Sequence, residues 1–317
     1  MKQKKAIVTG AGGFIGNHLV SYLKSKNYFV IGVDIKEPEF SSSQADEFKI
    51  ADMRDWSQTE AAFKSADELY MLAADMGGVG FINTVNAEVA RNNTLINMNS
   101  LQAAHVLNIG KVFFASSACV YPEFKQDSLH AVSLKESDTY PAQPDTPYGW
   151  EKLFAEQACL AFRKDYDMDI KIARFHNIYG PEGTFKGGRE KSPAAICRKV
   201  AQAKQNDTIE VWGDGKQERS YCYIDDCISG IDKLMQSDVS DPINIGSDRL
   251  VSIDDLVSIV SKIADKEIKI KHDLTKPQGV RSRNADISMA KETLGWEPGV
   301  ALEDGLRSTY DWILAQM

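Results

Sequence analysis

The sequence lacks the long apolar runs and the positive charge that would tie it to a membrane or to nucleic acid. No apolar run approaches the roughly 20 residues of a membrane-spanning helix, and the short run at 6–8 is followed at once by glycines, so we expect no signal peptide. Lys and Arg number 37 against 45 Asp and Glu, a net charge of −8. We therefore expect neither a membrane nor a nucleic acid as a partner.

Metal-binding and disulfide patterns are also missing. The five cysteines contain no C-x-x-C pair, and the five histidines are scattered along the chain without metal-ligand spacing. This pattern predicts a reducing, cytoplasmic environment and no metal site.

What the chain does contain is an alternation of short apolar strands and helix-period stretches in its first half. The expected strands are 5–9, 29–34, 68–72, 112–116 and 170–174, and the expected helices are 14–26, 84–108 and 147–165. This order predicts an α/β fold, a Rossmann doubly wound parallel sheet. After about residue 180 the pattern becomes α+β. We expect an NAD-binding domain at 1–180 and a substrate-binding region at 181–317, whose segments can interleave with the first.

A glycine-rich turn follows the first strand and opens the first helix. Such a turn brings the backbone close to a pyrophosphate, and the helix N-terminus faces the negative phosphates. The residues expected to hold a dinucleotide here are Gly10, Gly13, Phe14, Ile15 and Gly16.

Asp34 ends the second strand, where a carboxylate can bind both ribose hydroxyls and repel a 2′-phosphate, so NAD is favoured over NADP. Asp52 and Met53 follow a further expected strand, which lies between 29–34 and 68–72 in the sequence, and are candidates for the adenine. Ala73 and Ala74, after the fourth strand, offer small side chains beside the cofactor.

Tyr148 and Lys152 stand four residues apart in a predicted helix, one turn apart on the same face. An ammonium so placed can lower the pKa of a phenol, which then takes a proton from an alcohol as hydride leaves. With the glycine turn, Asp34, Ser117 and the strand end 174–181, this pair resembles the extended short-chain dehydrogenase/reductase family, which modifies nucleotide sugars. The resemblance implies that Tyr148 is the base, that Lys152 holds the nicotinamide ribose, and that Ser117 binds the reacting sugar oxygen.

Three loops, 73–81, 115–125 and 187–195, carry a narrower resemblance, to the branch of that family that epimerises GDP-mannose at carbons 3 and 5. Loop identity is a functional signal because packing alone does not dictate it. The resemblance implies GDP-L-galactose as product, with GDP-L-gulose as the alternative product. It also implies that Cys119 and Lys191 are the acid and base of ring-proton exchange; which is which stays open. The other four cysteines are expected in the core.

Binding the nucleotide sugar needs cations and backbone donors. The residues expected to contact it are Gly77, Gly78, Ser117, Ala118, Cys119, Asn177, Glu190, Lys191, Ser192, Lys199, Gln217, Arg219, Arg281 and Arg283. Of the last two, the sequence does not decide which binds the diphosphate. His176, between apolar neighbours, is expected to be structural.

Two alternatives remain open. A nucleotide-sugar 4-epimerase of the same family would not need Cys119 or Lys191. A non-catalytic NAD-sensing protein would commonly lose the Tyr–Lys pair, which this chain keeps. A 4,6-dehydratase is disfavoured, because Ala118 and Cys119 stand where such enzymes usually carry Asp and Glu. The two long helices are expected to pack on the sheet and to pair with a second subunit as a homodimer.

Overall fold

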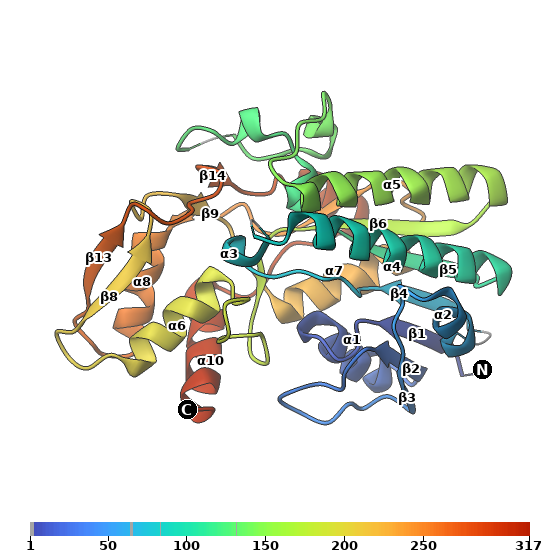
Figure 1. Ribbon diagram of the computed structural model, residues 1–317, viewed down its shortest axis with the longest axis horizontal. Coiled ribbons are helices and arrows are strands. Elements are labelled where there is room, and N and C mark those ends of the chain that lie inside the picture. The colour runs from blue at the N-terminus through green and yellow to red at the C-terminus, as the bar shows by residue number, and fades with distance from the viewer. Residues whose placement is uncertain (1–2, 64–65, 83, 131) are drawn as a thin grey trace.

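A central sheet of parallel strands organises the molecule. The computed structural model describes residues 3–63, 66–82, 84–130 and 132–317, and in this part the sheet has seven strands in the order β11-β6-β5-β4-β1-β2-β3 (Figure 1). The strands are β1 (Lys5–Thr9), β2 (Phe29–Asp34), β3 (Glu47–Ile50), β4 (Glu68–Met71), β5 (Lys111–Ser117), β6 (Asp169–Phe175) and β11 (Ile243–Ile245). Every neighbouring pair in it is parallel.

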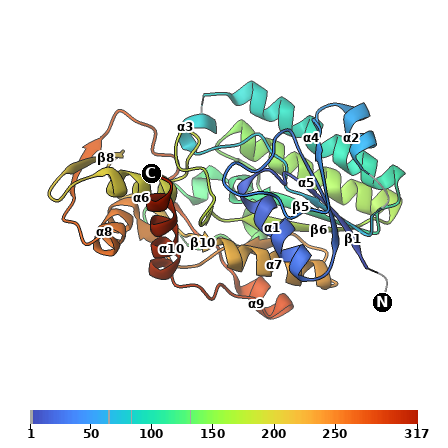
Figure 2. The same ribbon diagram turned by 90° about the horizontal axis from the view of Figure 1, so that it is seen from below.

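Helices cover both faces of this sheet, because its strands are apolar on both sides. One face packs on a core shared with α1 (Phe14–Ser25), α7 (Ile224–Gln236) and α9 (Ser288–Leu294). The other packs against α2 (Trp56–Ala62), α4 (Asn86–Val106) and α5 (Pro147–Tyr166). The turned view separates these two layers (Figure 2). The predicted doubly wound α/β fold is confirmed.

The smaller region lies at one end of the sheet, around a separate apolar core. It contains α6 (Ser192–Gln202), α8 (Ile253–Ile263) and α10 (Leu302–Ala315), with β8 (Thr208–Trp212) paired to β13 (Lys269–Asp273). The short elements that join the two regions are β7 (Ile178–Tyr179), β9 (Glu218–Arg219), β10 (Cys222–Tyr223), β12 (Val251–Ser252) and β14 (Ser282–Arg283).

The chain crosses between the two regions more than once. After β6 it enters the smaller region, returns through α7 to place β11 beside β6, and leaves again. The division at residue 180 therefore stays a prediction, with residues 243–245 lying in the main sheet. Among the described residues, no helix combines the length and the apolar character needed to cross a membrane.

The strand order reverses between β1 and β4, which lie side by side although β2 and β3 come between them in sequence. In parallel sheets, ligands bind at the carboxyl ends of strands beside such a reversal. The loops after β1, β4 and β5 all leave from that edge, as does the chain after β6. The expected cofactor and catalytic residues lie on these loops.

Candidate active site

The glycine turn after β1 packs closely on the loop after β4. Gly10 has φ of +75°, and a Cβ on it would lie 2.8 Å from the backbone nitrogen of Ala73. A Cβ on Gly16 would lie 2.0 Å from the carbonyl oxygen of Gly10. Both positions therefore need glycine. Gly13 is the N-cap of α1, whose first N–H groups lack partners within the helix and face this edge of the sheet.

Asp34 lies directly beside this turn. Its Oδ2 accepts a hydrogen bond from Gly12 N–H at 3.0 Å, and burial raises the pKa of its carboxyl. A tight glycine turn, a helix N-terminus and a carboxylate at the end of β2 fit the phosphates and ribose of a dinucleotide.

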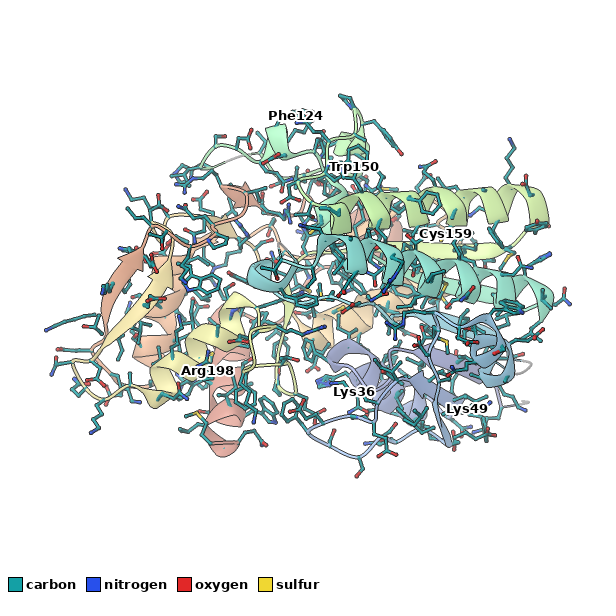
Figure 3. All side chains as sticks on the ribbon, in the orientation of Figure 1. Lys36, Lys49, Phe124, Trp150, Cys159 and Arg198 are labelled. Atoms are coloured by element: carbon teal, nitrogen blue, oxygen red, sulfur yellow. The ribbon has the colours of Figure 1, made fainter. Side chains whose placement is uncertain are left out.

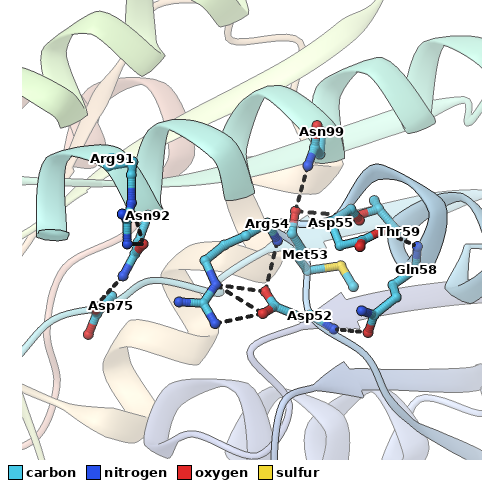
Figure 4. A network of polar contacts seen from close by, with 10 residues as sticks. All are labelled: Asp52, Met53, Arg54, Asp55, Gln58, Thr59, Asp75, Arg91, Asn92 and Asn99. Carbon is cyan, nitrogen blue, oxygen red and sulfur yellow. Dashed lines mark hydrogen bonds and ion pairs between the residues drawn. The ribbon is translucent and has the colours of Figure 1, made fainter.

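Asp52 and Met53, expected near the adenine, take part in a polar network below α4 (Figure 4). Arg54 Nε lies 2.9 Å from Asp52 Oδ1 and its Nη2 lies 2.6 Å from Oδ2, and this pairing lowers the pKa of Asp52. The Met53 side chain is buried, and its carbonyl accepts a hydrogen bond from Asn99 at 2.9 Å. Their contact with adenine stays a prediction.

The first turn of α5 holds Tyr148 at the carboxyl end of β5. Thr146 caps this helix by accepting a hydrogen bond from Gly149 N–H. Tyr148 is buried, and the Ser117 hydroxyl lies near enough to its phenol to affect the pKa of Tyr148. Lys152 Nζ lies 5.8 Å from the centre of the Tyr148 ring and donates to the carbonyl of Ala115 at 3.2 Å. The helical spacing of the pair thus places both side chains on the same buried face of α5.

The pKa of Tyr148 differs from the sequence expectation. Burial raises it above the ordinary value for tyrosine, and the neighbouring Cys119 and Glu151 raise it further. The hydrogen bond with Ser117 acts in the opposite direction. The physical reason for the difference is that desolvation of a phenolate outweighs the helical neighbour when the ring is enclosed by protein.

Cys119 lies half-buried among cationic side chains. Arg283 Nη1 lies 3.2 Å from its Sγ, although 164 residues separate the two in sequence. Arg283 also pairs with Asp145, Nη2 to Oδ2 at 3.5 Å, and donates from Nε to Gln126. Burial and the nearby charge of Arg283 lower the pKa of Arg219 to about 10, which places this second arginine in the same cluster.

Lys191 shares this cluster from the other side. It is the N-cap of α6, and burial lowers the pKa of its ammonium, while the neighbouring Cys119 and Cys227 act in the opposite direction. The structure therefore brings Ser117, Cys119, Tyr148 and Lys191 to one place.

Several other expected contacts are engaged elsewhere. Arg281 forms a two-pronged ion pair with Asp214, at 3.1 and 3.0 Å, and Lys199 Nζ lies 2.6 Å from the carbonyl oxygen of Glu210. Hydrogen bonds or ion pairs inside the protein also engage four further residues: Asn177 with Ser220, Glu190 with Arg198, Ser192 with Tyr221 and Gln217 with Trp212. Their contacts with substrate stay predictions. Asp145 and Gln126 were missed, since neither stands in a motif that marks it.

His176 lies behind this site and is fully buried. Its Nε2 is 3.0 Å from Asn244 Oδ1, and Nδ1 has no hydrogen-bond partner in the described part of the chain. Burial lowers its pKa from 6.5 to about 3, with a smaller contribution from the charges of Arg283 and Arg174. The histidine is structural, as expected, and it is held in its neutral form.

We expect this histidine to make the protein acid-sensitive. Its folded pKa is depressed, so the unfolded chain binds more protons between pH 6.5 and about 3. The contribution of His176 to the free energy of unfolding is therefore complete above the ordinary histidine pKa. As pH falls below that value, the free energy of unfolding decreases by up to about 1.4 kcal/mol per pH unit. Denaturant unfolding at several pH values should show a shallower slope for His176→Gln. The control His130→Gln, at an exposed position, should keep the wild-type slope; equal slopes in all three proteins would contradict the prediction.

The fold, the glycine turn and the buried Tyr–Lys pair define a dinucleotide-dependent enzyme of sugar nucleotides. A model of the NAD dependent epimerase/dehydratase family matches residues 6–246, and the chain belongs to this family. Among its relatives, GDP-mannose 3,5-epimerase 1 of Oryza sativa subsp. indica is 46% identical over 312 residues, which are 98% of this chain and 82% of the rice protein.

Solved structures of 4-epimerases share the fold. UDP-glucose 4-epimerase of Thermotoga maritima, with UDP-glucose, has a TM-score of 0.87 and 26% identity over 98% of this chain and 99% of its own. UDP-glucuronic acid 4-epimerase from Bacillus cereus, in complex with UDP-glucuronic acid and NAD, has a TM-score of 0.84 and 28% identity over 99% and 100%.

Proposed function

We propose that this enzyme converts GDP-mannose to GDP-L-galactose by inverting carbons 3 and 5, with GDP-L-gulose formed when carbon 5 alone is inverted. The observation that carries the proposal is the placement of Cys119. Its thiol lies 3.2 Å from Arg283 and interacts electrostatically with both Tyr148 and Lys191. A redox pair and a second acid–base pair therefore meet at one site, and a simple 4-epimerase needs only the first.

The first stage is oxidation of the sugar at carbon 4. NAD, held by the glycine turn and Asp34, supplies the hydride acceptor and later the hydride donor. Tyr148 takes the proton of the carbon 4 hydroxyl, and Ser117, near the Tyr148 phenol, orients the sugar oxygen. Lys152, fixed by the Ala115 carbonyl, holds the nicotinamide ribose beside Tyr148.

The second stage exchanges protons on the ring. A ketone at carbon 4 makes the hydrogens on carbons 3 and 5 acidic, and inversion needs a base on one face and an acid on the other. Cys119 Sγ lies 3.2 Å from Arg283, and the thiolate is the form of a cysteine that can accept a proton. Lys191, whose ammonium is destabilised by burial, readily gives up a proton. Cys119 and Lys191 are the acid–base pair, and hydride return to carbon 4 completes the cycle.

The diphosphate is assigned to Arg283 and Arg219. Arg283 Nη2 is buried and makes no hydrogen bond in the described part of the chain; its ion pair with Asp145 Oδ2, at 3.5 Å, is through a single oxygen. Arg281, the alternative, is neutralised by both carboxylate oxygens of Asp214. An arginine that already has a bidentate partner is the poorer choice for a phosphate.

Incubation with GDP-mannose in heavy water tests the function. We expect NMR to show deuterium at carbons 3 and 5 without added cofactor, and GDP-L-galactose among the products. A 4-epimerase would invert carbon 4 with no deuterium from solvent, and an NAD-sensing protein would leave the sugar unchanged. Either result would overturn the proposal.

We also infer a homodimer that forms through α4 and α5, which lie side by side (Figure 1). Their inner faces pack on the sheet, while Leu95, Trp150 and Phe154 are 41, 49 and 52% exposed. Trp150, near the start of α5, is labelled in Figure 3. It stands one turn from Phe154 on the same face, and such an apolar surface suits a second copy of the same two helices.

We place the enzyme in the cytoplasm, since its five cysteines are free.

Replacing Phe154 by glutamate should dissociate this dimer. Burying a charge in an apolar four-helix interface is unfavourable, so sedimentation should show a dimer for the wild type and a monomer for Phe154→Glu. The control Leu314→Glu changes a residue that is 49% exposed on α10 and should remain dimeric. A monomeric wild type would remove the inference.

A further inference from the structure

The loop that carries Lys191 is fastened to the segment after β4 by one side chain, Arg189. Its Nη1 lies 3.0 Å from Asp75 Oδ1 and 3.4 Å from the carbonyl oxygen of Met76. Its guanidinium carbon lies 3.7 Å from the centre of the Phe81 ring. We call Arg189, Asp75, Met76 and Phe81 the clasp. The chemistry proposed above uses none of these four residues.

The two backbones meet at the same point. Gly78 N–H donates to the carbonyl of Arg189 at 3.0 Å. A Cβ on Gly78 would lie 2.4 Å from the carbonyl oxygen of Glu190, so any larger residue at 78 would push the loops apart. A main-chain bond, an ion pair and a cation stacked on a ring therefore join the same two segments.

Hydrogen bonds to α4 hold Asp75, the carboxylate of the clasp, in place. Asp75 Oδ2 accepts a hydrogen bond from Asn92 at 2.9 Å (Figure 4). Asp75 N–H donates to Asn93 at 2.6 Å, and the Asn93 amide returns a bond to the Asp75 carbonyl at 3.1 Å. Both asparagines lie on α4 and are buried. Arg189 is thus tied to the helix layer of the NAD-binding sheet.

The loop is anchored in a core at Phe185, but the glycines between Phe185 and Arg189 add no packing of their own. Gly187 and Gly188 have φ of +91° and +86°, and a Cβ on either would meet no atom within 4 Å. Beyond the clasp, Glu190 pairs with Arg198 of α6 at 3.0 Å; Figure 3 labels this arginine. Lys191 therefore lies between α6 on one side and the clasp, two residues away, on the other.

We propose that Arg189 is a positioning residue, which sets the place of Lys191 opposite Cys119 by clasping its loop to the segment after β4. The proposal rests on the role given to Lys191 in the proposed function. Arg189 is about half exposed, and a half-exposed ion pair is weak alone. The stacked ring and the Gly78 bond are what make the contact directional, and lysine lacks the planar group that stacks.

Four variants test the clasp: Arg189→Gln, Arg189→Lys, Asp75→Asn, and Arg189→Gln combined with Asp75→Asn. We expect deuterium entry at carbons 3 and 5 to fall roughly 10- to 100-fold, as for a misplaced catalytic group. Reduction of bound nicotinamide on adding GDP-mannose should not change, because Tyr148 is untouched. The double variant should be no slower than the slower single one, since both remove the same contact. Arg189→Lys should fall between wild type and Arg189→Gln.

The control Arg249→Gln removes a similarly exposed arginine, paired with Glu303, and should leave both rates unchanged. Amide exchange of Gly78, measured without substrate, should be faster in Arg189→Gln than in the wild type or the control. Unchanged amide protection would overturn the clasp, and faster amide exchange with wild-type ring exchange would overturn the positioning role. A wild-type chain that exchanges no deuterium overturns the proposed function instead, and Gly78 exchange then still decides whether Arg189 holds the loop.

Discussion

Tyr148→Phe should abolish both the redox step and everything that depends on it. Removing the phenolic oxygen removes the base for the carbon 4 hydroxyl, a loss of about 10²- to 10⁴-fold. Ring protons become acidic only after carbon 4 is a ketone. We therefore expect no reduced nicotinamide on mixing with GDP-mannose and no deuterium at carbons 3 and 5 in heavy water.

The matched control is Tyr140→Phe. Tyr140 is 56% exposed, and its hydroxyl accepts a hydrogen bond from Gln157 at 2.9 Å, away from the reacting residues. This variant should keep wild-type rates. Deuterium exchange that persists at the wild-type rate in Tyr148→Phe would show that the ring is activated by some other route.

Cys119→Ala should separate the two stages. Tyr148 and Lys152 remain, so bound nicotinamide should still be reduced when GDP-mannose is added. Deuterium entry at the ring carbon served by the thiol should fall by at least about 10²-fold, because one member of the acid–base pair is gone. The absorbance of reduced nicotinamide and the NMR exchange rate are measured on the same sample.

Cys159→Ala controls for loss of a thiol as such. Cys159 is fully buried in the core under α5, so its truncation should lower the stability by about 1 kcal/mol without changing either stage. Full deuterium exchange in Cys119→Ala would assign ring chemistry to another group and leave the thiol as a neighbour of Arg283 only.

Much of the fold was predictable because its inner strands are long enough to be recognised as continuous apolar runs. The predictions for β1 and β2 match the observed bounds, and α1 and α5 each differ by one residue at the C-terminal end. β11 was missed because it has three residues with a buried asparagine at its centre. A strand this short has no periodicity, and its place beside β6 depends on tertiary pairing.

One missed element did carry a signal. In α7, Ile224, Cys227, Ile228, Ile231 and Leu234 recur at helical spacing, and all are buried. This stripe predicts an amphipathic helix. Its packing on the main sheet could not be predicted, because the helix is distant in sequence from most strands of that sheet.

The candidate site was predictable where one element carries the residues, as with Tyr148 and Lys152 on α5. It was not predictable where distant segments meet. Arg283 reaches Cys119 only because β14 pairs with β9, and sequence spacing left Arg281 and Arg283 equivalent. Their different surroundings exist only in the folded chain: Arg281 pairs with both carboxylate oxygens of Asp214, whereas Arg283 contacts the Cys119 thiol and one oxygen of Asp145.

The return of β11 to the sheet means that the two halves of this enzyme are not separable parts. A fragment ending at residue 180 would lack β11 and α7, so β6 would become a bare edge with unpaired backbone groups on one side. The same cut would uncover the apolar face on which α7 packs. Such a fragment would aggregate rather than bind a dinucleotide, and an evolutionary exchange of the substrate-binding half between relatives would have to carry an edge strand of the main sheet with it.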